Sequence, residues 1–440
     1  MIDKLTTRMR GTASGAALTA ALAACGGEAG GDGARSTSLD APDYGITPAV
    51  EEAWSVGALD GEAWEVLGDI VSMDFDSDGN LYALDSQAGH VLVFDVAGNY
   101  LRTIGRSGEG PGEIGDGASV RVLPDNRLAV YDRGRFAVQL FTLDGEYLEL
   151  VAYDPADAAP YAVDDWTPGG AILTTGVVTM NTEGSVDAEG QESRSVSMSM
   201  GGPSADGRPV YRFGLDGTNE TVHIAAALPP VDEDPVDETG EGVQISMNVP
   251  RAFTPPLLVA ALSDGRVAVA DSIAYLIRLV ADGTQAGVLA RPVEPMEVNE
   301  SIRSAHREQL MQRPTMTRLG MGGDVPPEAE AMIEQAYRRS LDRIQFGDFV
   351  PVVRAMAADL EDRLWVERAA MPGEPGPVDI LTPDGRYLGT IPPGALAVPD
   401  AFGPDGLMAY EEESAIGYPV IRVVRMPAAG LLESAAGATR

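Results

Sequence analysis

The feature that most constrains the fold of this chain is a tight turn followed by a β-strand, a pattern that recurs along most of its length. It is clearest in residues 70–104, where apolar side chains from Val71 to Phe75 alternate with polar ones at the two-residue period of a strand. Asp78-Gly79 then supplies residue types that accept positive φ in a tight hairpin. We expect four antiparallel strands in this stretch, at 71–76, 81–84, 91–94 and 100–104.

The apolar residues of this small sheet lie on both of its faces, so both faces must be covered. Copies of the sheet that pack face to face around an axis can cover one another. Equivalent turn residues mark the copies, at Gly79, Asn126, Gly170, Gly265, Asp362 and Gly406. Some intervals between them match one four-stranded blade, and the others are about twice as long. Since residues 176–208 and 299–345 contain no further copy, we interpret the long intervals as insertions and expect six blades.

The last blade is one strand short. It offers strand-like segments only around 395–398, 407–410 and 420–426. Residues Glu52–Val56, which precede the first blade, can supply the missing strand. We therefore expect the two ends of the repeat region to pair antiparallel and to close the ring.

The direction of the strands sorts the loops onto two faces of the ring. The turns from first to second and from third to fourth strand share one face, which we call the trimmed face because its turns are tight. The other face, which we call the elaborated face, carries the connections between blades and the second-to-third loops. All the long segments fall there: 105–115, 176–208, 227–254, 292–350, 369–377 and 411–418. Because recognition loops gather on one rim of a scaffold, we expect the binding face here, with Arg106, Glu109 and Glu113 as candidate residues.

Three stretches of the sequence resemble a known family. They are DSDGNLYALD from Asp76, GHVLVFDVAGNYLRTIG from Gly89 and, most specifically, GRSGEGPGE at Gly105–Glu113. The chain resembles the six-bladed β-propellers of the NHL-repeat type that occur as bacterial exported lipoproteins, over residues of about 50 to 428. The resemblance implies an all-β propeller fold and a cell-envelope setting, and members of the family mostly lack an assigned activity.

The first 25 residues predict export. Residues 1–24 combine a basic start with a short run of small apolar residues that ends just before Cys25, and the run is shorter than the roughly 20 residues of a membrane span. This is similar to a bacterial lipoprotein signal, in which the cysteine is acylated. The alternative is a plain secretory signal with an incidental cysteine. Because Cys25 is the only cysteine and has no disulfide partner, we favour lipidation.

These boundaries predict four segments. We expect a signal peptide at 1–24, a flexible tether at 25–48, the propeller at 49–428 and a disordered tail at 429–440. The mature protein is then exported and held at the cell envelope by its lipid. Gly26, rather than Asp, follows the cysteine, which by resemblance is compatible with sorting to the outer membrane.

The charge of the chain limits its partners. Acidic residues outnumber basic ones 67 to 31, and the net charge is −36. Such a surface repels nucleic acid and anionic bilayers, so we expect no nucleic-acid partner and membrane contact only through the anchor. We expect a monomer that binds an unidentified protein or small molecule.

Two sequence patterns suggest ion binding, but each has a structural interpretation that we favour. The acidic run Asp74, Asp76, Asp78 and Asp85 around Gly79 matches a calcium loop, but its flanks alternate as strands and other blades repeat the turn without the extra acids. The glycines of 105–112 resemble a phosphate loop, but a strand and not a helix follows them. We interpret the first as a hairpin and the second as a connection between blades.

The histidines do not predict a catalytic or metal centre. His90 begins a third strand, His223 lies in a fourth strand and His306 lies in the helical insertion, so the three do not converge. The sequence contains no nucleophile elbow of the GxSxG type. We therefore expect no catalytic residue, no metal and no cofactor.

The insertion at 299–345 is the one helical region. A helix start near Asp324 and Pro326-Pro327 precedes apolar residues at helical spacing, namely Met332, Ile333, Ala336, Tyr337, Leu341 and Ile344. We expect this stripe to pack on the propeller, with a lid or a docking helix as the alternative. The acidic run at 231–242 predicts a disordered loop, with weak cation binding as the alternative.

Together these features predict a lipid-anchored, six-bladed propeller that acts as a binding or protein-interaction module of the cell envelope. The alternative is a propeller hydrolase or lyase acting on a small extracellular substrate. That alternative requires several polar side chains to meet on the central axis near the elaborated loops.

Overall fold

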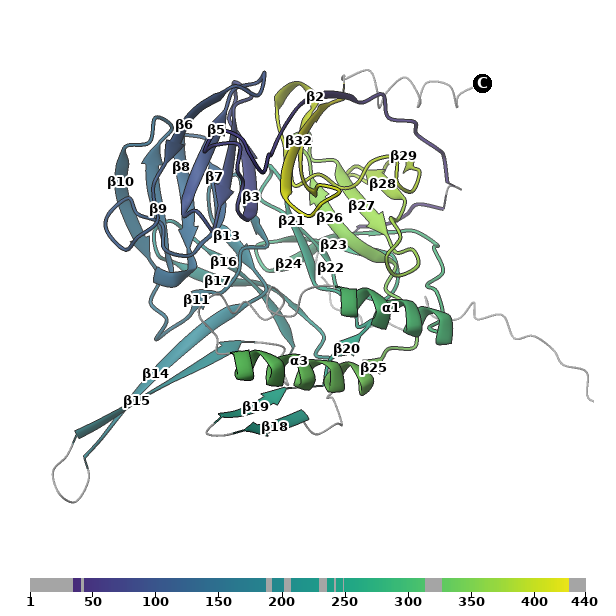
Figure 1. The fold of residues 1–440 in the computed structure, drawn as a ribbon. Coiled ribbons are helices and arrows are strands. Elements are labelled where there is room, and N and C mark those ends of the chain that lie inside the picture. The colour runs from purple at the N-terminus through teal and green to yellow at the C-terminus, as the bar shows by residue number, and fades with distance from the viewer. Residues whose placement is uncertain are drawn as a thin grey trace, which may run out of the picture. The chain divides into compact units, whose positions relative to one another are not determined.

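The computed structural model describes residues 35–40, 43–186, 192–201, 207–228, 236–240, 243–247, 249–312 and 327–426 (Figure 1). Cys25, the predicted signal peptide and the predicted tail at 429–440 lie outside the described residues. No helix within the described ranges is long and apolar enough to cross a bilayer.

Six sheets of antiparallel strands form the six predicted blades. Blade 1 contains β3 (Ile70–Phe75), β4 (Leu81–Asp85), β5 (His90–Phe94) and β6 (Tyr100–Ile104), and blade 2 contains β7 (Gly117–Val122), β8 (Arg127–Asp132), β9 (Ala137–Thr142) and β10 (Tyr147–Ala152). Blade 3 contains β12 (Asp165–Trp166), β13 (Ile172–Thr174), β16 (Arg208–Phe213) and β17 (Asn219–Ala225), and blade 4 contains β21 (Leu258–Ala261), β22 (Val267–Ala270), β23 (Leu276–Ala281) and β24 (Thr284–Ala290). Blade 5 contains β26 (Val353–Ala358), β27 (Leu364–Arg368), β28 (Val378–Leu381) and β29 (Tyr387–Ile391), and blade 6 contains β30 (Ala401–Phe402), β31 (Leu407–Glu413), β32 (Pro419–Arg425) and β2 (Glu51–Val56).

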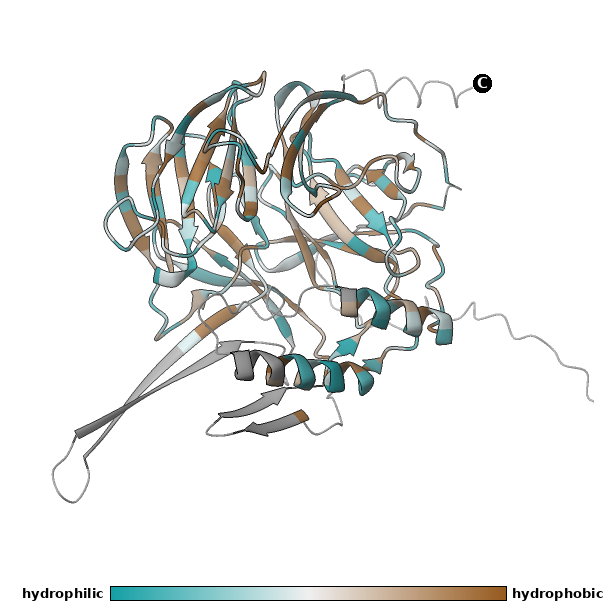
Figure 2. Ribbon diagram, in the orientation of Figure 1, coloured by the Kyte–Doolittle hydropathy of each residue, from teal (hydrophilic) through white to brown (hydrophobic). Residues whose placement is uncertain are grey.

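The hydrophobic core lies between the blades. One buried cluster joins blades 1 and 2 through residues such as Leu84 and Val130. Similar clusters join blades 2 and 3, blades 3 and 4, blades 4 and 5, and blades 5 and 6. The cluster that joins blades 6 and 1 includes Leu81 and Ala409. Figure 2 shows the hydrophobic residues spread along the blade strands. Apolar side chains on both faces of each sheet are therefore buried by the neighbouring sheets, as the sequence predicts.

The turns between first and second strands confirm the predicted register of the six repeats. All six turn residues have positive φ: Gly79 82°, Asn126 62°, Gly170 83°, Gly265 87°, Asp362 59° and Gly406 75°. A positive φ at this position is thus common to all six blades, although the residue type differs at Asn126 and Asp362. The turn of blade 6 differs in having a second positive φ, of 54° at Asp405. Asn and Asp tolerate this conformation better than other residues with a Cβ.

The predicted closure is confirmed. β2 pairs antiparallel with β32 and forms the outermost strand of blade 6. Trp54 of β2 also packs on blade 1, where its ring centroid lies 5.6 Å from that of Phe94. The first strand of this blade is β30 and not the predicted 395–398, because prolines on both sides of that segment cannot donate hydrogen bonds to a ladder.

The prediction of a flexible tether at 25–48 is wrong for residues 35–40 and 43–48. With residues 49 and 50 they form what we call the belt, which lies along the outer edges of blades 4 and 5. β1 (Arg35–Ser38) pairs in parallel with β24, and Ile46 donates its amide to Thr390. Ile46 is fully buried in the cluster between blades 5 and 6. Composition alone predicted a solvated segment, but outer strands with unpaired edges can bind it.

The long segments of the elaborated face contain additional structure (Figure 1). β14 (Val177–Val186) and β15 (Glu192–Gly201) form a long hairpin between the second and third strands of blade 3. β18 (Val236–Gly240) and β19 (Val243–Met247) form a second hairpin, so the prediction of a disordered acidic loop is wrong for 236–240. Pairing with β19 gives hydrogen-bond partners to the backbone N–H and C=O groups of this acidic strand.

The helical insertion between blades 4 and 5 contains α1 (Glu300–Gln312) and α3 (Pro327–Asp342). Residues Ile333, Ala336 and Leu341 of α3 are buried. The helix packs against the hairpin of β18 and β19, whereas the sequence predicted that this stripe packs on the propeller. The two ends of the insertion are joined by a bridge between Glu297 and Phe349. Near its C-terminal end, β25 (Gln345–Phe346) pairs in parallel with β20 (Arg251–Ala252), which precedes blade 4.

Candidate functional site

The predicted binding residues Arg106, Glu109 and Glu113 lie on the connection between blades 1 and 2. Arg106 donates to Glu113 at 2.6 Å, and the other Glu113 oxygen accepts the Gly110 amide at 2.7 Å. These hydrogen bonds lower the pKa of Glu113, the Gly110 amide contributing most. Glu109 is exposed and contributes to the Glu113 carboxylate only through its backbone amide. Arg106 and Glu113 therefore stabilise the loop to which both belong. None of the three residues lines a cavity described below.

Two carboxylates of the acidic run, Asp76 and Asp85, accept backbone amides of their own blade and its start. Asp76 accepts the amides of Asp78 and Asn80, both at 2.9 Å, and so holds the hairpin turn. Asp85 accepts the amides of Gly68 and Asp69 at the start of the blade. Within the described ranges, no three His, Cys, Asp or Glu side chains are grouped to hold a metal ion.

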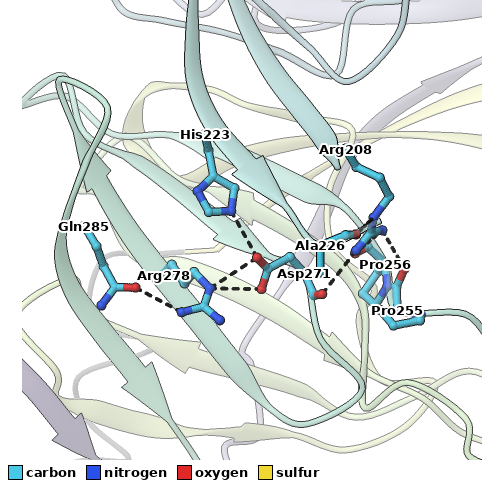
Figure 3. Close-up of polar contacts among 8 residues, drawn as sticks. All are labelled: Arg208, His223, Ala226, Pro255, Pro256, Asp271, Arg278 and Gln285. Atoms are coloured by element: carbon cyan, nitrogen blue, oxygen red, sulfur yellow. Dashed lines mark hydrogen bonds and ion pairs between the residues drawn. The ribbon is translucent and has the colours of Figure 1, made fainter. Parts of the chain in front are cut away.

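The three histidines lie apart, as the sequence indicated, but His223 has a partner that the sequence did not reveal. Its Nε2 lies 3.0 Å from Asp271 Oδ2, across the interface of blades 3 and 4 (Figure 3). Arg278 donates to the same carboxylate at 3.1 Å. Burial raises the pKa of Asp271, but the His223 hydrogen bond and the Arg278 charge outweigh it and lower the pKa below its ordinary value.

Arg208 completes this interface (Figure 3). Its guanidinium donates to the carbonyls of Ala226 and Pro255 at 2.8 Å and to that of Pro256 at 3.0 Å. These carbonyls belong to the segment that connects blades 3 and 4. The network therefore fixes the connection in place, and it lies outside the cavities described next.

The convergent polar site of the molecule is a cavity on the axis of the ring. A cavity of about 410 Å³ lies at the elaborated end of the first strands, and a second of about 330 Å³ continues toward the trimmed end. We define the axial site as the charged residues of the first cavity, Arg121, Asp164, Asp165, Asp400 and Glu411. Ser119 and Trp166 also line it.

Some axial carboxylates hold neighbouring blades together. The first strand of each blade has an unpaired edge on the axis, where free amides need acceptors. Asp74 of blade 1 accepts the amide of Val122 in blade 2 at 2.8 Å. Asp165 of blade 3 accepts the amide of Ala261 in blade 4 at 2.7 Å. These two carboxylates therefore have a structural role in addition to any role toward a ligand.

The electrostatics of the axial site differ from those of the outer surface. Burial raises the pKa of Asp74 and of Asp165, because a charged carboxylate is poorly solvated there. Partial desolvation also raises the pKa of Glu411, and the nearby carboxylate of Asp400 adds to the effect. Both Glu411 and Asp400 still face the water of the cavity.

Arg121 is the cation of this site. Its Nε lies 3.5 Å from Asp74 Oδ2, and its side chain remains 32% exposed. Arg121 and the cavity-facing carboxylates can therefore bind a ligand that carries both an anionic group and hydrogen-bond donors. Ser119 accepts a hydrogen bond from Trp166 at 2.7 Å, and no histidine stands beside it among the described residues that line the cavity.

The site residues predicted from the sequence do not include this site, although the repeats contain a signal for it. The fifth residue before each turn residue is charged in the first three blades, as Asp74, Arg121 and Asp165. The equivalent residue in the last three blades is alanine, and Ala357 and Ala401 line the second axial cavity. Charge on one half of the ring and small side chains on the other create a polar space on the axis.

Comparisons with known proteins support the fold. A family described as a 6-bladed beta-propeller matches residues 66–166. No curated protein matches the chain.

Three solved structures illustrate the similarity. A Bacteroides vulgatus protein of the duf4221 family is 11% identical, with a TM-score of 0.46, over 86% of this chain and 99% of that one. A streptogramin B lyase is 11% identical, with a TM-score of 0.39, over 86% and 97%. A gluconolactonase from Xanthomonas campestris is 14% identical, with a TM-score of 0.36, over 90% and 98%. Similarity this low carries no information about activity.

Proposed function

We propose that this six-bladed propeller is an exported, lipid-anchored protein of the cell envelope that binds a small polar ligand in its axial site. The observation that supports this proposal most strongly is that Arg121 and several carboxylates line the same cavity of about 410 Å³. That volume lies within the range of small-molecule sites, roughly 300–1,000 Å³. Arg121 binds an anionic group of the ligand, and Asp164, Asp400 and Glu411 accept its hydrogen-bond donors.

The described part of the chain begins on the face opposite the axial site. β1 runs parallel to β24, and β2 runs antiparallel to β32, so both lead from the trimmed toward the elaborated side. The axial site lies at the elaborated end of the first strands.

Binding is tested by screening purified protein against amino acids, organic acids and sugars and by measuring the shift of its melting temperature. We expect a ligand that raises this temperature in the wild type and loses its effect in Arg121→Gln. The matched control is Arg386→Gln, which removes an exposed arginine from a trimmed-face turn. A ligand that stabilises Arg121→Gln and the wild type equally would contradict the axial site.

Anchoring is tested separately by expressing the full chain and its Cys25→Ala variant in a bacterium that processes lipoproteins. We expect the wild type in the outer-membrane fraction with the mass of an acylated protein that starts at Cys25. The variant should lose the added mass and leave the membrane. If the wild type carries no lipid, this part of the proposal fails while the axial site remains testable.

A second candidate is a hydrolase or lyase that acts on a small extracellular substrate. It is supported by the raised pKa of Asp165 and Glu411, since a carboxyl group with a raised pKa keeps its proton to a higher pH and can act as a general acid. Turnover of small esters or lactones that disappears in Glu411→Gln, with ligand binding retained, would favour this candidate. Binding without turnover would leave the protein a binding module.

A further inference from the structure

A second cavity on the elaborated face is distinct from the axial site. It is a groove of about 350 Å³ between α1 and blade 5. Its walls come from the segment before β21, from α1, from the start of β26 and from the loop after β27. The residues used here are Phe253, His306, Val350, Arg354, Ala370 and Met371. We call it the α1 groove.

The groove has an apolar floor. Val350 is buried together with Val298 and Ile302, and Phe253 and Met371 pack against this cluster. Leu310, Pro351 and Val353 also line the groove. The lining is therefore largely apolar, as in sites for ligands with an apolar body.

Phe253 holds its place in the wall through an unusual backbone. Its φ is 58°, a conformation that is rare for a bulky residue and costs of the order of 1 kcal/mol or more. Gly347 allows this geometry, because a Cβ there would lie 2.4 Å from the Phe253 carbonyl oxygen. The Phe253 ring centroid then lies 4.8 Å from that of His306. Arg208 also fixes the carbonyls of Pro255 and Pro256 next in the chain, as Figure 3 shows.

The described lining of the groove contains a cation and no carboxylate. Among the described residues that line it there is no Asp or Glu, although the sequence contains 67 acidic residues against 31 basic ones. The ionisable residues among them are His306 and Arg354. Arg354 lies 3.3 Å from Glu367 and its side chain is still 48% exposed. An anionic group is therefore tolerated here and repelled from most of the remaining surface.

We propose that the α1 groove binds an amphiphilic carboxylate, a small molecule with an apolar body and one anionic group. The body lies between Phe253 and Met371, over the buried cluster. The carboxylate lies at Arg354. This site goes beyond the axial site, which is polar and takes a ligand of a different chemical class.

The test uses three probes of equal chain length, decanoate, decanol and decylammonium, below their micelle-forming concentrations. Binding to the purified propeller is measured by calorimetry. We expect decanoate to bind at least about tenfold more tightly than decanol, because one charge-assisted hydrogen bond changes an affinity by about that factor. Decylammonium should bind most weakly. Equal binding of decanoate and decanol, tightest binding of decylammonium, or no binding of decanoate would each overturn the proposal.

Variants locate the binding. Arg354→Gln should weaken decanoate about tenfold and leave decanol unchanged, and Arg354→Lys should restore part of the loss. Ala370→Trp should fill the groove and abolish binding of both probes. Arg386→Gln on the trimmed face is the control and should change neither. Melting temperatures show whether each variant is folded, and decanoate binding that survives both Arg354→Gln and Ala370→Trp would refute the site.

Discussion

The contact between the belt and blade 5 gives the sharpest test of the structure. Gly389 of β29 has a φ of 146°, and a Cβ at this position would lie 2.4 Å from Ile46 Cγ1. Gly389→Ala therefore introduces both backbone strain and a steric clash. The strain costs about 1–2 kcal/mol, and overpacking of a filled site costs about 1–3 kcal/mol. We expect a loss of about 2–5 kcal/mol in the free energy of unfolding.

A double-mutant cycle separates these two effects. Ile46 is fully buried, so Ile46→Ala alone should cost about 2–5 kcal/mol. In the double variant the clash with the Ile46 side chain is absent, and only the backbone oxygen of Tyr44, 3.0 Å from the added Cβ, remains close. The two changes should then cost about 1–3 kcal/mol less together than the sum of the single losses.

The free energies come from chemical denaturation, with limited proteolysis of the belt as a second measurement. The control is Gly265→Ala, since Gly265 has a φ of 87° and a Cβ added there would meet no atom within 4 Å, so that only strain is expected. Strictly additive losses in the cycle would refute the reasoning. So would a belt that proteases cleave equally in the wild type and in Ile46→Ala.

Three further predictions concern contacts between distant parts of the chain. Burial raises the pKa of Asp43, but hydrogen bonds and charges from Arg368 and Arg291 outweigh burial, so the pKa is lowered. Ionised Asp43 therefore stabilises the fold above its ordinary pKa of 3.8. This stabilisation is lost as the pH falls through the lowered pKa. Asp43→Asn should therefore lower the melting temperature at pH 6, by less than the equivalent of about 1 kcal/mol because Asp43 is half exposed, and the difference should vanish in strong acid; a constant difference would contradict this. Arg208→Met should lower the free energy of unfolding by about 2–4 kcal/mol, because the carbonyls that Arg208 binds lose a charged donor. If Arg208→Lys restored the full stability, the planar geometry of the guanidinium would not be needed. Trp54→Ala should cost about 2–3 kcal/mol, since the indole is only partly buried, and an unchanged stability would refute its part in closing the ring.

The repeats illustrate what sequence reasoning could reach. Gly79 and its five equivalents have residue types that accept positive φ, and this local requirement is written in the sequence at each turn. The antiparallel pairing of β2 with β32 was also predictable. The last blade lacked one strand, and an unassigned strand-like segment preceded the first blade. The elaborated and trimmed faces followed from strand direction alone.

The candidate sites were less accessible to sequence reasoning. Arg121 and Asp165 stand 44 positions apart and looked like ordinary polar residues of two strands. Only the ring brings them to one cavity, together with Glu411 from the last blade. The α1 groove likewise depends on Phe253 and Arg354, which belong to segments on either side of the helical insertion.

By itself the sequence determined the blades, their number, their order and the faces of their loops, because strand period and turn chemistry act between residues that are close in the chain. The tertiary structure decided which side chains meet on the axis, where the belt binds and how the α1 groove is lined. Those outcomes depend on packing between residues far apart in the chain, and local propensities do not encode it.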